Sequence, residues 1–117
     1  MIPDCLIMLA PSQIHGVGVF AVGKIEVGFV PFTEQNVWII ISGKELESLS
    51  TELQVLVKHY GVQQKNGEYK IPTDFRHICL SAYLNHSINP NIDAKEFVAL
   101  RNIMPGEELT IDYNKLS

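Results

Sequence analysis

The sequence predicts a mainly β fold, in which a strand-dominated domain carries one helical segment. Short apolar or alternating stretches recur along the chain, and residues that favour turns bound them, such as Asn66-Gly67 and Pro105-Gly106. Only residues 43–60 place apolar side chains at the three- and four-residue intervals of a helix. Pattern alone therefore favours many short strands around one core.

Four short strands are expected before the helical segment. Residues 4–10 and 17–22 are apolar or alternate, with a turn between them. Residues 27–41 are rich in Val, Ile, Phe and Trp, and Gly28 and Pro31 divide them into two short strands.

The helical segment has recognisable start and stop signals. Ser42 stands three residues before Glu45, which is the spacing of a capping box. Ser50 can cap a second helical start within the segment. The apolar periodicity runs to Tyr60, and Gly61 is expected to end the helix in the left-handed conformation.

The remainder of the chain is expected to form a hairpin, one or two helical turns and two further strands. The hairpin has Asn66-Gly67 at its tip, the strongest such signal in the chain. A Pro-Gly pair in type II order joins the last two strands. In chain order, these segments are residues 62–64, 69–71, 77–84, 97–103 and 109–113.

Length and composition indicate one globular domain over residues 1–117. Apolar residues make up 46% and charged residues 19%, which excludes wholesale disorder. A net charge of −4 with scattered basic residues argues against direct nucleic-acid binding and suits a basic partner such as a lysine-bearing peptide. The sequence shows neither a membrane span nor a secretory signal, so we expect a cytoplasmic protein, or a nuclear one in a eukaryote.

The two cysteines, Cys5 and Cys79, are too few for a disulfide framework. His77 lies two residues before Cys79, but a zinc site takes about four ligands and the others are not visible nearby. We therefore predict no metal site and two reduced, buried thiols.

Near the N-terminus, two glycines flank one residue in His15-Gly16-Val17-Gly18, next to a predicted strand. Such a pair allows a positive φ or a close approach of the backbone to a ligand. The third glycine and the following helix of a dinucleotide fingerprint are missing. A tight turn and a cofactor cradle both remain compatible with the pattern.

Two further blocks lie near the C-terminus. Asn85-His86-Ser87, followed by Asn89-Pro90-Asn91, forms a bend rich in hydrogen-bonding side chains; alone, Asn-His-Ser is typical of a turn capped by its own side chains. The second block is a strand that follows the Pro-Gly turn and ends on Tyr113, where a half-buried ring with a solvated hydroxyl is the usual arrangement.

Three carboxylates surround that last strand, and an acid–base role is not predicted for them. Glu107 and Glu108 follow a Pro-Gly turn, where side chains are usually solvated. Neither they nor Asp112 has a partner carboxylate at a working spacing.

Taken together, the strings Ser12 to Ala21, Asn85 to Asn91 and Gly106 to Tyr113 resemble the SET domain, the fold of most protein-lysine methyltransferases. The likeness covers nearly the whole chain. It implies a β-clip-like fold of several small curved sheets with one helical insert and a C-terminal pseudoknot, in which the last segment passes under a preceding loop. It also implies S-adenosylmethionine as the cofactor and a protein lysine, on a histone or another protein, as the methyl acceptor.

The resemblance also implies site residues. The positions that match cofactor-contacting residues of the family are His15, Gly16, Val17, Gly18, Tyr60, Asn85 and His86. In the family, the Asn and His hold the adenine and amino-acid ends of the cofactor, partly through backbone groups. The match at Tyr60 is loose, and packing of its ring on the helix face is the alternative. Tyr113 matches the catalytic tyrosine, at which the methyl group meets the lysine nitrogen.

Some positions depart from the family pattern. Phe32 is the nearest aromatic where many members have a substrate-orienting tyrosine. Ile111 and Ala94 occupy places where an aromatic residue can narrow the lysine channel, so we expect multiple methylation. Only Asn114 to Ser117 follow Tyr113, and many members have a closing segment there. A partner subunit, a homodimer contact or the substrate itself is expected to complete the channel.

Three functions therefore remain open. The first is S-adenosylmethionine-dependent methylation of a protein lysine. The second is a SET-like module with weak or lost catalysis that binds the cofactor or a protein and acts in regulation. The third is another small β-domain that binds a sugar or a nucleotide.

Overall fold

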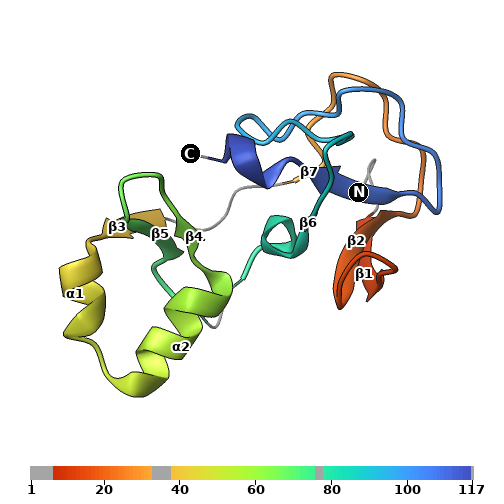
Figure 1. Ribbon diagram of the computed structural model, residues 1–117. Coiled ribbons are helices and arrows are strands. Elements are labelled where there is room, and N and C mark those ends of the chain that lie inside the picture. Colours follow the sequence, from red (N-terminus) through yellow and green to blue (C-terminus); the bar gives the residue numbers. More distant parts are fainter. Residues whose placement is uncertain (1–6, 33–37, 76–77, 117) are drawn as a thin grey trace. The chain divides into compact units, whose positions relative to one another are not determined.

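The computed structural model describes residues 7–32, 38–75 and 78–116 (Figure 1). Contacts divide the chain into two compact units, one built from residues up to 33 together with residues 80–115, the other from the rest. Each unit contains its own sheet. The described residues thus form mostly short strands in small sheets with few helices, as predicted.

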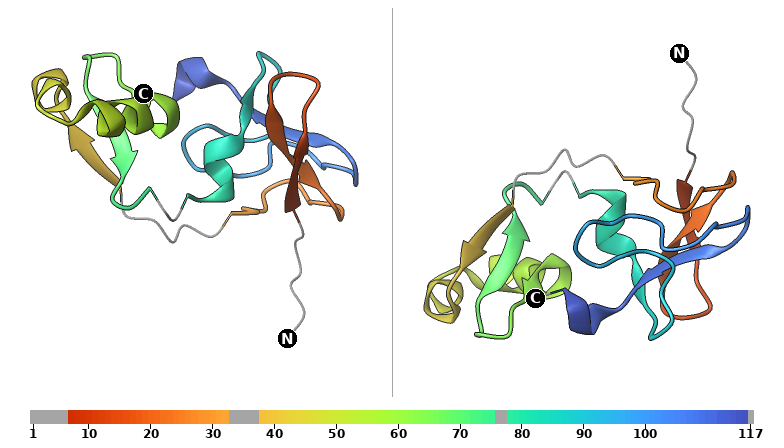
Figure 2. Two further views of the ribbon diagram at one scale, coloured as in Figure 1. Left: turned by 90° about the horizontal axis from the view of Figure 1, so that it is seen from below. Right: turned by 90° about the horizontal axis from the view of Figure 1, so that it is seen from above.

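The first unit contains a four-stranded sheet in the order β1-β2-β7-β6. Its strands are β1 (Ile7–Pro11), β2 (Val17–Ala21), β6 (Asn85–His86) and β7 (Glu108–Ile111). The hairpin of β1 and β2, red to orange in Figure 2, confirms the two N-terminal strands that the sequence predicts. β7 runs antiparallel to β2 and parallel to β6. The C-terminal strand therefore lies between one N-terminal strand and the Asn-His corner.

The core of this unit consists of aliphatic side chains from segments far apart in sequence. The most deeply buried are Val19, Ile25, Leu84, Ile92, Ile103 and Leu109, each exposing at most 1% of its surface. Two short 3₁₀ turns flank the sheet, η1 (Leu80–Tyr83) and η2 (Tyr113–Lys115), and the first confirms the helical turns predicted over residues 77–84.

Asn91 explains the Asn-Pro-Asn motif. Only 2% of its surface is exposed. Its Nδ2 donates to the carbonyl of Glu108 at 2.8 Å, and its Oδ1 accepts from the amide of Thr110 at 2.8 Å. The side-chain amide thus replaces a strand partner for β7, where the motif alone suggested a locally capped bend. Ser87 N and Ile92 N also donate to carbonyls of β7, those of Ile111 and Thr110; the predicted pseudoknot stays a prediction.

Of the two strands predicted over residues 27–41, only one forms in the described residues, at Trp38–Ile41, and the strand predicted over residues 97–103 is absent. Gly28 has φ +88° and lies in a turn in which Phe29 N donates to the carbonyl of Glu26. Phe97 has φ +56°, a left-handed backbone that no strand contains. The apolar content of these segments favours burial but does not require an extended backbone. They therefore contribute isolated β-bridges, such as that between Ile25 and Ile103, rather than strands.

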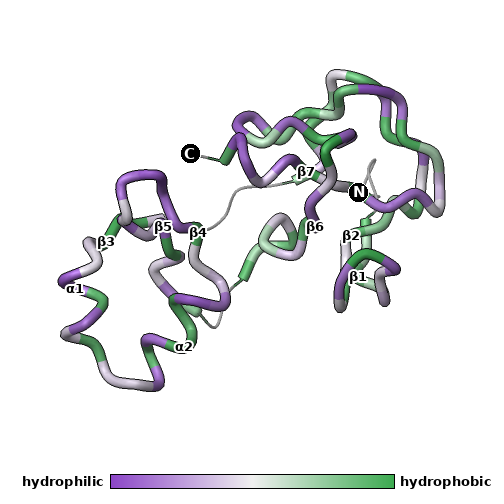
Figure 3. The backbone as a smooth tube through the Cα atoms, viewed as in Figure 1, coloured by the Kyte–Doolittle hydropathy of each residue, from purple (hydrophilic) through white to green (hydrophobic). Residues whose placement is uncertain are grey.

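The second unit holds a three-stranded antiparallel sheet and two helices. The sheet has the order β3-β5-β4, with β3 (Trp38–Ile41), β4 (Val62–Gln63) and β5 (Tyr69–Pro72). Gly67 has φ +89° at the tip of the β4–β5 hairpin, which confirms the Asn-Gly prediction. Figure 3 shows this connection as a hydrophilic segment, whereas β3 is hydrophobic.

Two helices, α1 (Gly43–Glu47) and α2 (Thr51–Tyr60), replace the one expected. Ser42 and Glu45 form the predicted capping box, and Ser50 caps the second start by accepting from Leu53 N. The buried core that these helices cover consists of Ile41, Leu46, Val57 and Ile71.

The prediction of a left-handed cap at Gly61 is wrong. This glycine is extended, with φ −75° and ψ 155°, because the chain passes directly into β4. A Cβ at this position would lie 2.4 Å from the carbonyl oxygen of Val57 and 3.0 Å from Ile71. Glycine is therefore required here by close packing rather than by a positive φ.

Several remaining expectations concern cysteines, metals and membranes. Cys79 is free and only partly buried, whereas a buried thiol was predicted; Cys5 and His77 lie outside the described residues. Across residues 7–32, 38–75 and 78–116, no three His, Cys, Asp or Glu side chains gather in a way that could hold a metal ion. In the same residues, no helix has the length and apolar character of a membrane span.

Candidate active site

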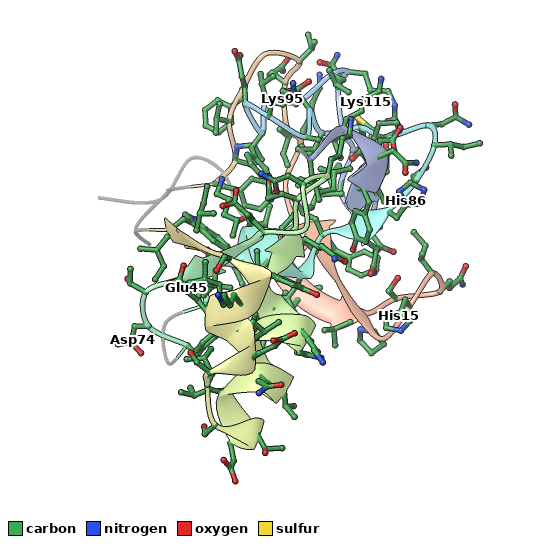
Figure 4. All side chains as sticks on the ribbon, turned by 60° about the vertical axis from the view of Figure 1, so that its left-hand side comes forward. His15, Glu45, Asp74, His86, Lys95 and Lys115 are labelled. Atoms are coloured by element: carbon green, nitrogen blue, oxygen red, sulfur yellow. The ribbon has the colours of Figure 1, made fainter. Side chains whose placement is uncertain are left out.

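The turn between β1 and β2 ends at Gly16, the first glycine of the Gly-x-Gly pattern, and the second, Gly18, lies in β2. Hydrogen bonds within the turn close it. Ser12 N donates to the carbonyl of Gly16 at 2.8 Å, and Ile14 N donates to Ser12 Oγ at 2.9 Å. Gly16 has φ +48°, and a Cβ there would meet nothing within 4 Å. The side chain of His15 is exposed and lies out on the turn (Figure 4). The backbone, not the His15 ring, is therefore what this turn offers to the rest of the site.

Asn85 joins this turn to the C-terminal corner. Its Nδ2 lies 3.0 Å from the carbonyl of His15 and 3.2 Å from that of Val17. The same nitrogen lies 2.8 Å from Oε2 of Glu108. Only 7% of Asn85 is exposed. Three acceptors share the two protons of this amide, so its N–H groups are committed to the chain itself.

Glu108 is a site residue that sequence reasoning missed. It was expected to be solvated, but its carboxylate accepts from Ser12 Oγ at 2.7 and 2.9 Å as well as from Asn85. A Cβ on Gly18 would lie 2.2 Å from Oε2 of Glu108. The second glycine of the Gly-x-Gly pattern therefore leaves the space in which this carboxylate lies. Glu108 lies opposite Phe20 in the pairing of β2 with β7, and no local sequence pattern gives this register.

His86 and Tyr113 are in direct contact. Tyr113 N donates to Nδ1 of His86 at 3.0 Å, and the two ring centroids are 5.2 Å apart. A nitrogen that accepts carries no proton, so the other ring nitrogen, Nε2, carries it in the neutral imidazole. Asp112 Oδ1 lies 3.8 Å from Nδ1. The imidazole thus fixes the backbone at the position where the last strand turns into η2.

The hydroxyl of Tyr113 donates to the carbonyl of Leu84 at 2.5 Å. Burial raises the pKa of this phenol above its ordinary value, and the charge of Glu108 raises that pKa further. The phenol is therefore neutral at physiological pH. Because the hydroxyl donates its proton to the Leu84 carbonyl, the phenol oxygen can interact with a ligand as a hydrogen-bond acceptor. About half of the residue, 48%, is exposed.

The remaining candidates are placed as follows. Tyr60 ends α2, and its ring contacts His59 and Phe75 within the second unit; its proposed cofactor contact stays a prediction. Phe32 is buried and packs edge-on against Phe97, with 6.1 Å between ring centroids.

Two acidic side chains next to the site have structural partners. Glu107 pairs with Arg101 at 3.0 Å and accepts from Met104 N, and these bonds lower the pKa of its carboxyl. The side chain of Asp112 is only 14% exposed, and its Oδ1 accepts from Asn114 N at 3.0 Å.

A continuous set of contacts therefore connects the Gly16–Gly18 turn, Asn85, His86 and Tyr113. Backbone groups of the turn, the ring of His86 and the phenol oxygen are suited to a ligand that is polar at one end and cationic near Tyr113. S-adenosylmethionine meets that description, because it combines a nucleoside with an amino acid and a sulfonium. The amide of the Asn85 side chain positions the turn, and the contact of Asn85 with a cofactor stays a prediction.

Comparisons with known proteins identify the fold and the family of this chain. No curated protein matches the sequence. Among solved structures, a candidate histone methyltransferase of Plasmodium falciparum is similar, with a TM-score of 0.54 and 19% identity over 92% of this chain and 91% of that one. At this identity the likeness shows the fold. The family model of the SET domain matches residues 16–114, from the Gly-x-Gly turn to the residue after Tyr113. The chain belongs to the SET domain family.

Proposed function

We propose that this protein transfers the methyl group of S-adenosylmethionine to the ε-amine of a lysine in a protein substrate. The observation that carries the proposal is the placement of Tyr113. Its hydroxyl is held by the carbonyl of Leu84 and its backbone by His86, next to the corner that Asn85 fixes to the Gly-x-Gly turn.

The cofactor would be held by backbone groups of residues 15–18 and of the Asn85-His86 corner, together with the imidazole of His86. When bound, S-adenosylmethionine supplies an electrophilic methyl group that needs no metal and no covalent enzyme intermediate. The protein contributes alignment, and holding two reactants at near-attack distance can lower a barrier by about 7–11 kcal/mol. The hydrogen bonds around Tyr113 fix one side of that alignment.

The lysine must lose a proton before it can react. With an ordinary lysine pKa of about 10.4, deprotonation at pH 7 costs about 4–5 kcal/mol. A half-buried, neutral phenol oxygen is a suitable neighbour for the neutral amine. It can accept a hydrogen bond from the amine N–H, and it has no negative charge that would stabilise the ammonium form of the lysine. The raised pKa of Tyr113 keeps that oxygen neutral.

Two assays test the proposal. Titration calorimetry with S-adenosylmethionine should show binding, and transfer of a radiolabelled methyl group into mixed proteins and histones should yield methyl-lysine. Tyr113→Phe should abolish transfer and leave cofactor affinity within about threefold, because the hydroxyl is assigned to the reacting atoms.

Each alternative predicts a distinct result. Cofactor binding without transfer to any lysine favours the binding or regulatory module, which the hydroxyl-free Phe32 supports. No cofactor binding contradicts both readings and favours a different small β-domain.

A further inference from the structure

One carboxylate joins three segments that are far apart in the sequence. Glu108 begins β7, and its oxygens accept from Ser12 Oγ on the β1–β2 turn and from Nδ2 of Asn85 on β6. All three contacts lie between 2.7 and 2.9 Å. A charged acceptor makes hydrogen bonds about twice as strong as neutral ones.

The space that the Glu108 carboxylate occupies is next to Gly18. A Cβ on Gly18 would be 2.2 Å from its Oε2 and 3.0 Å from Nδ2 of Asn85. Absence of a side chain at Gly18 therefore lets the carboxylate reach Ser12 and Asn85 together. The neighbouring Glu107 makes none of these contacts and pairs with Arg101 instead.

We infer that Glu108 is a positioning residue, whose carboxylate holds the β1–β2 turn against the Asn85 corner in the conformation that binds the cofactor. The inference rests on the proposed function for its cofactor. We call Ser12, Asn85 and Glu108 the clamp, because Ser12 and Asn85 both donate to the carboxylate of Glu108. Without the carboxylate, Asn85 still contacts His15 and Val17, but Ser12 loses its partner on β7.

Loss of the clamp should lower the fraction of molecules whose turn is ready to bind. The apparent affinity for the cofactor falls in proportion to that fraction. The rate at saturating cofactor does not, because every bound molecule already has an ordered turn. Glu108→Gln removes the charge and replaces one of the two acceptor oxygens by an NH2 group, which faces either Ser12 Oγ or Nδ2 of Asn85, both of which donate to the carboxylate in the wild type. We expect the dissociation constant for S-adenosylmethionine to rise about tenfold and kcat at saturating cofactor to stay within about threefold.

Ligand-free protein offers a test that does not depend on the cofactor. The amide of residue 12 donates to Gly16 O across the turn, so its hydrogen exchange reports opening of the turn. In Glu108→Gln this amide should exchange about tenfold faster than in the wild type. Glu107→Gln is the matched control, an adjacent carboxylate outside the clamp, and should match the wild type in both exchange and affinity.

Ser12→Ala provides a second variant that keeps the test decisive if Glu108→Gln does not fold. It should reproduce the faster exchange and the weaker binding, and the double variant should be less impaired than the sum of the two single ones, because both remove the contact between Ser12 and Glu108. Exchange and affinity in Glu108→Gln equal to those of Glu107→Gln would overturn the inference. A wild type that does not bind S-adenosylmethionine would instead contradict the proposed function, while the exchange comparison still decides whether the clamp exists.

Discussion

Replacing Asn91 by leucine tests the structural basis of the C-terminal strand. Asn91 is 2% exposed, and its amide satisfies two backbone groups of β7, the carbonyl of Glu108 and the amide of Thr110. Leucine has a similar size but neither donates nor accepts. The substitution therefore leaves both groups buried and unpaired.

The magnitude follows from those two groups. Each buried, unsatisfied group costs about 1–3 kcal/mol, so the variant should lose about 2–6 kcal/mol of unfolding free energy. A domain of ordinary stability has about 5–15 kcal/mol in total. Asn91→Leu should therefore be strongly destabilised and, at the upper end, unfolded at room temperature.

Urea unfolding followed by circular dichroism measures the loss of unfolding free energy, provided the slope of that free energy against urea concentration is the same in both proteins. Asn89→Leu is the matched control, since Asn89 is the exposed asparagine of the same motif. It should change stability by less than about 0.5 kcal/mol. A loss under about 1 kcal/mol in Asn91→Leu would refute the view that its amide substitutes for a strand partner.

Three further outcomes are expected. Subtracting the ultraviolet titration curve of Tyr113→Phe from that of the wild type should give a phenol that ionises above the ordinary pKa of about 10, and a midpoint at or below 10 contradicts this. The stability that this raised pKa contributes is present below about pH 10 and is lost as pH rises through the higher pKa of the folded state. Because the folded pKa of Glu107 is lowered, Glu107→Gln should lose a small amount of stability, under about 1 kcal/mol for so exposed a pair. This difference should be present above about pH 4.5 and fade as pH falls through the lower folded pKa; a difference that persists in acid refutes the assignment. Mass spectrometry of the methylated substrate should show dimethyl or trimethyl lysine, as aliphatic Ile111 and Ala94 suggest; monomethyl product alone contradicts it.

Much of the fold was predictable because its signals are local. Capping by Ser42 and Ser50 and the Asn66-Gly67 hairpin each depend on hydrogen bonds or dihedral angles within a few residues. Sequence patterns report such short-range constraints directly. Gly61 was misjudged because the pattern gives the glycine but not its reason, which is the close approach of the Val57 carbonyl and of Ile71 from another strand.

The site was predictable only in part, for the same reason. The family strings located the turn, the corner and Tyr113, and the structure brings these into one set of contacts. Glu108 was missed because its partners are 96 and 23 residues away. Its carboxylate looks like an ordinary solvated side chain until β7 is placed beside β2. Asn91 was assigned to a local bend for the same reason, since its true partners lie on β7.

A crystal structure with S-adenosylhomocysteine bound tests the central claim most directly. The account predicts the nucleoside and amino-acid ends on the Gly16–Gly18 turn and the Asn85-His86 corner, with the sulfur facing the hydroxyl of Tyr113. Density for the ligand at another surface, or a sulfur remote from that phenol, would contradict it.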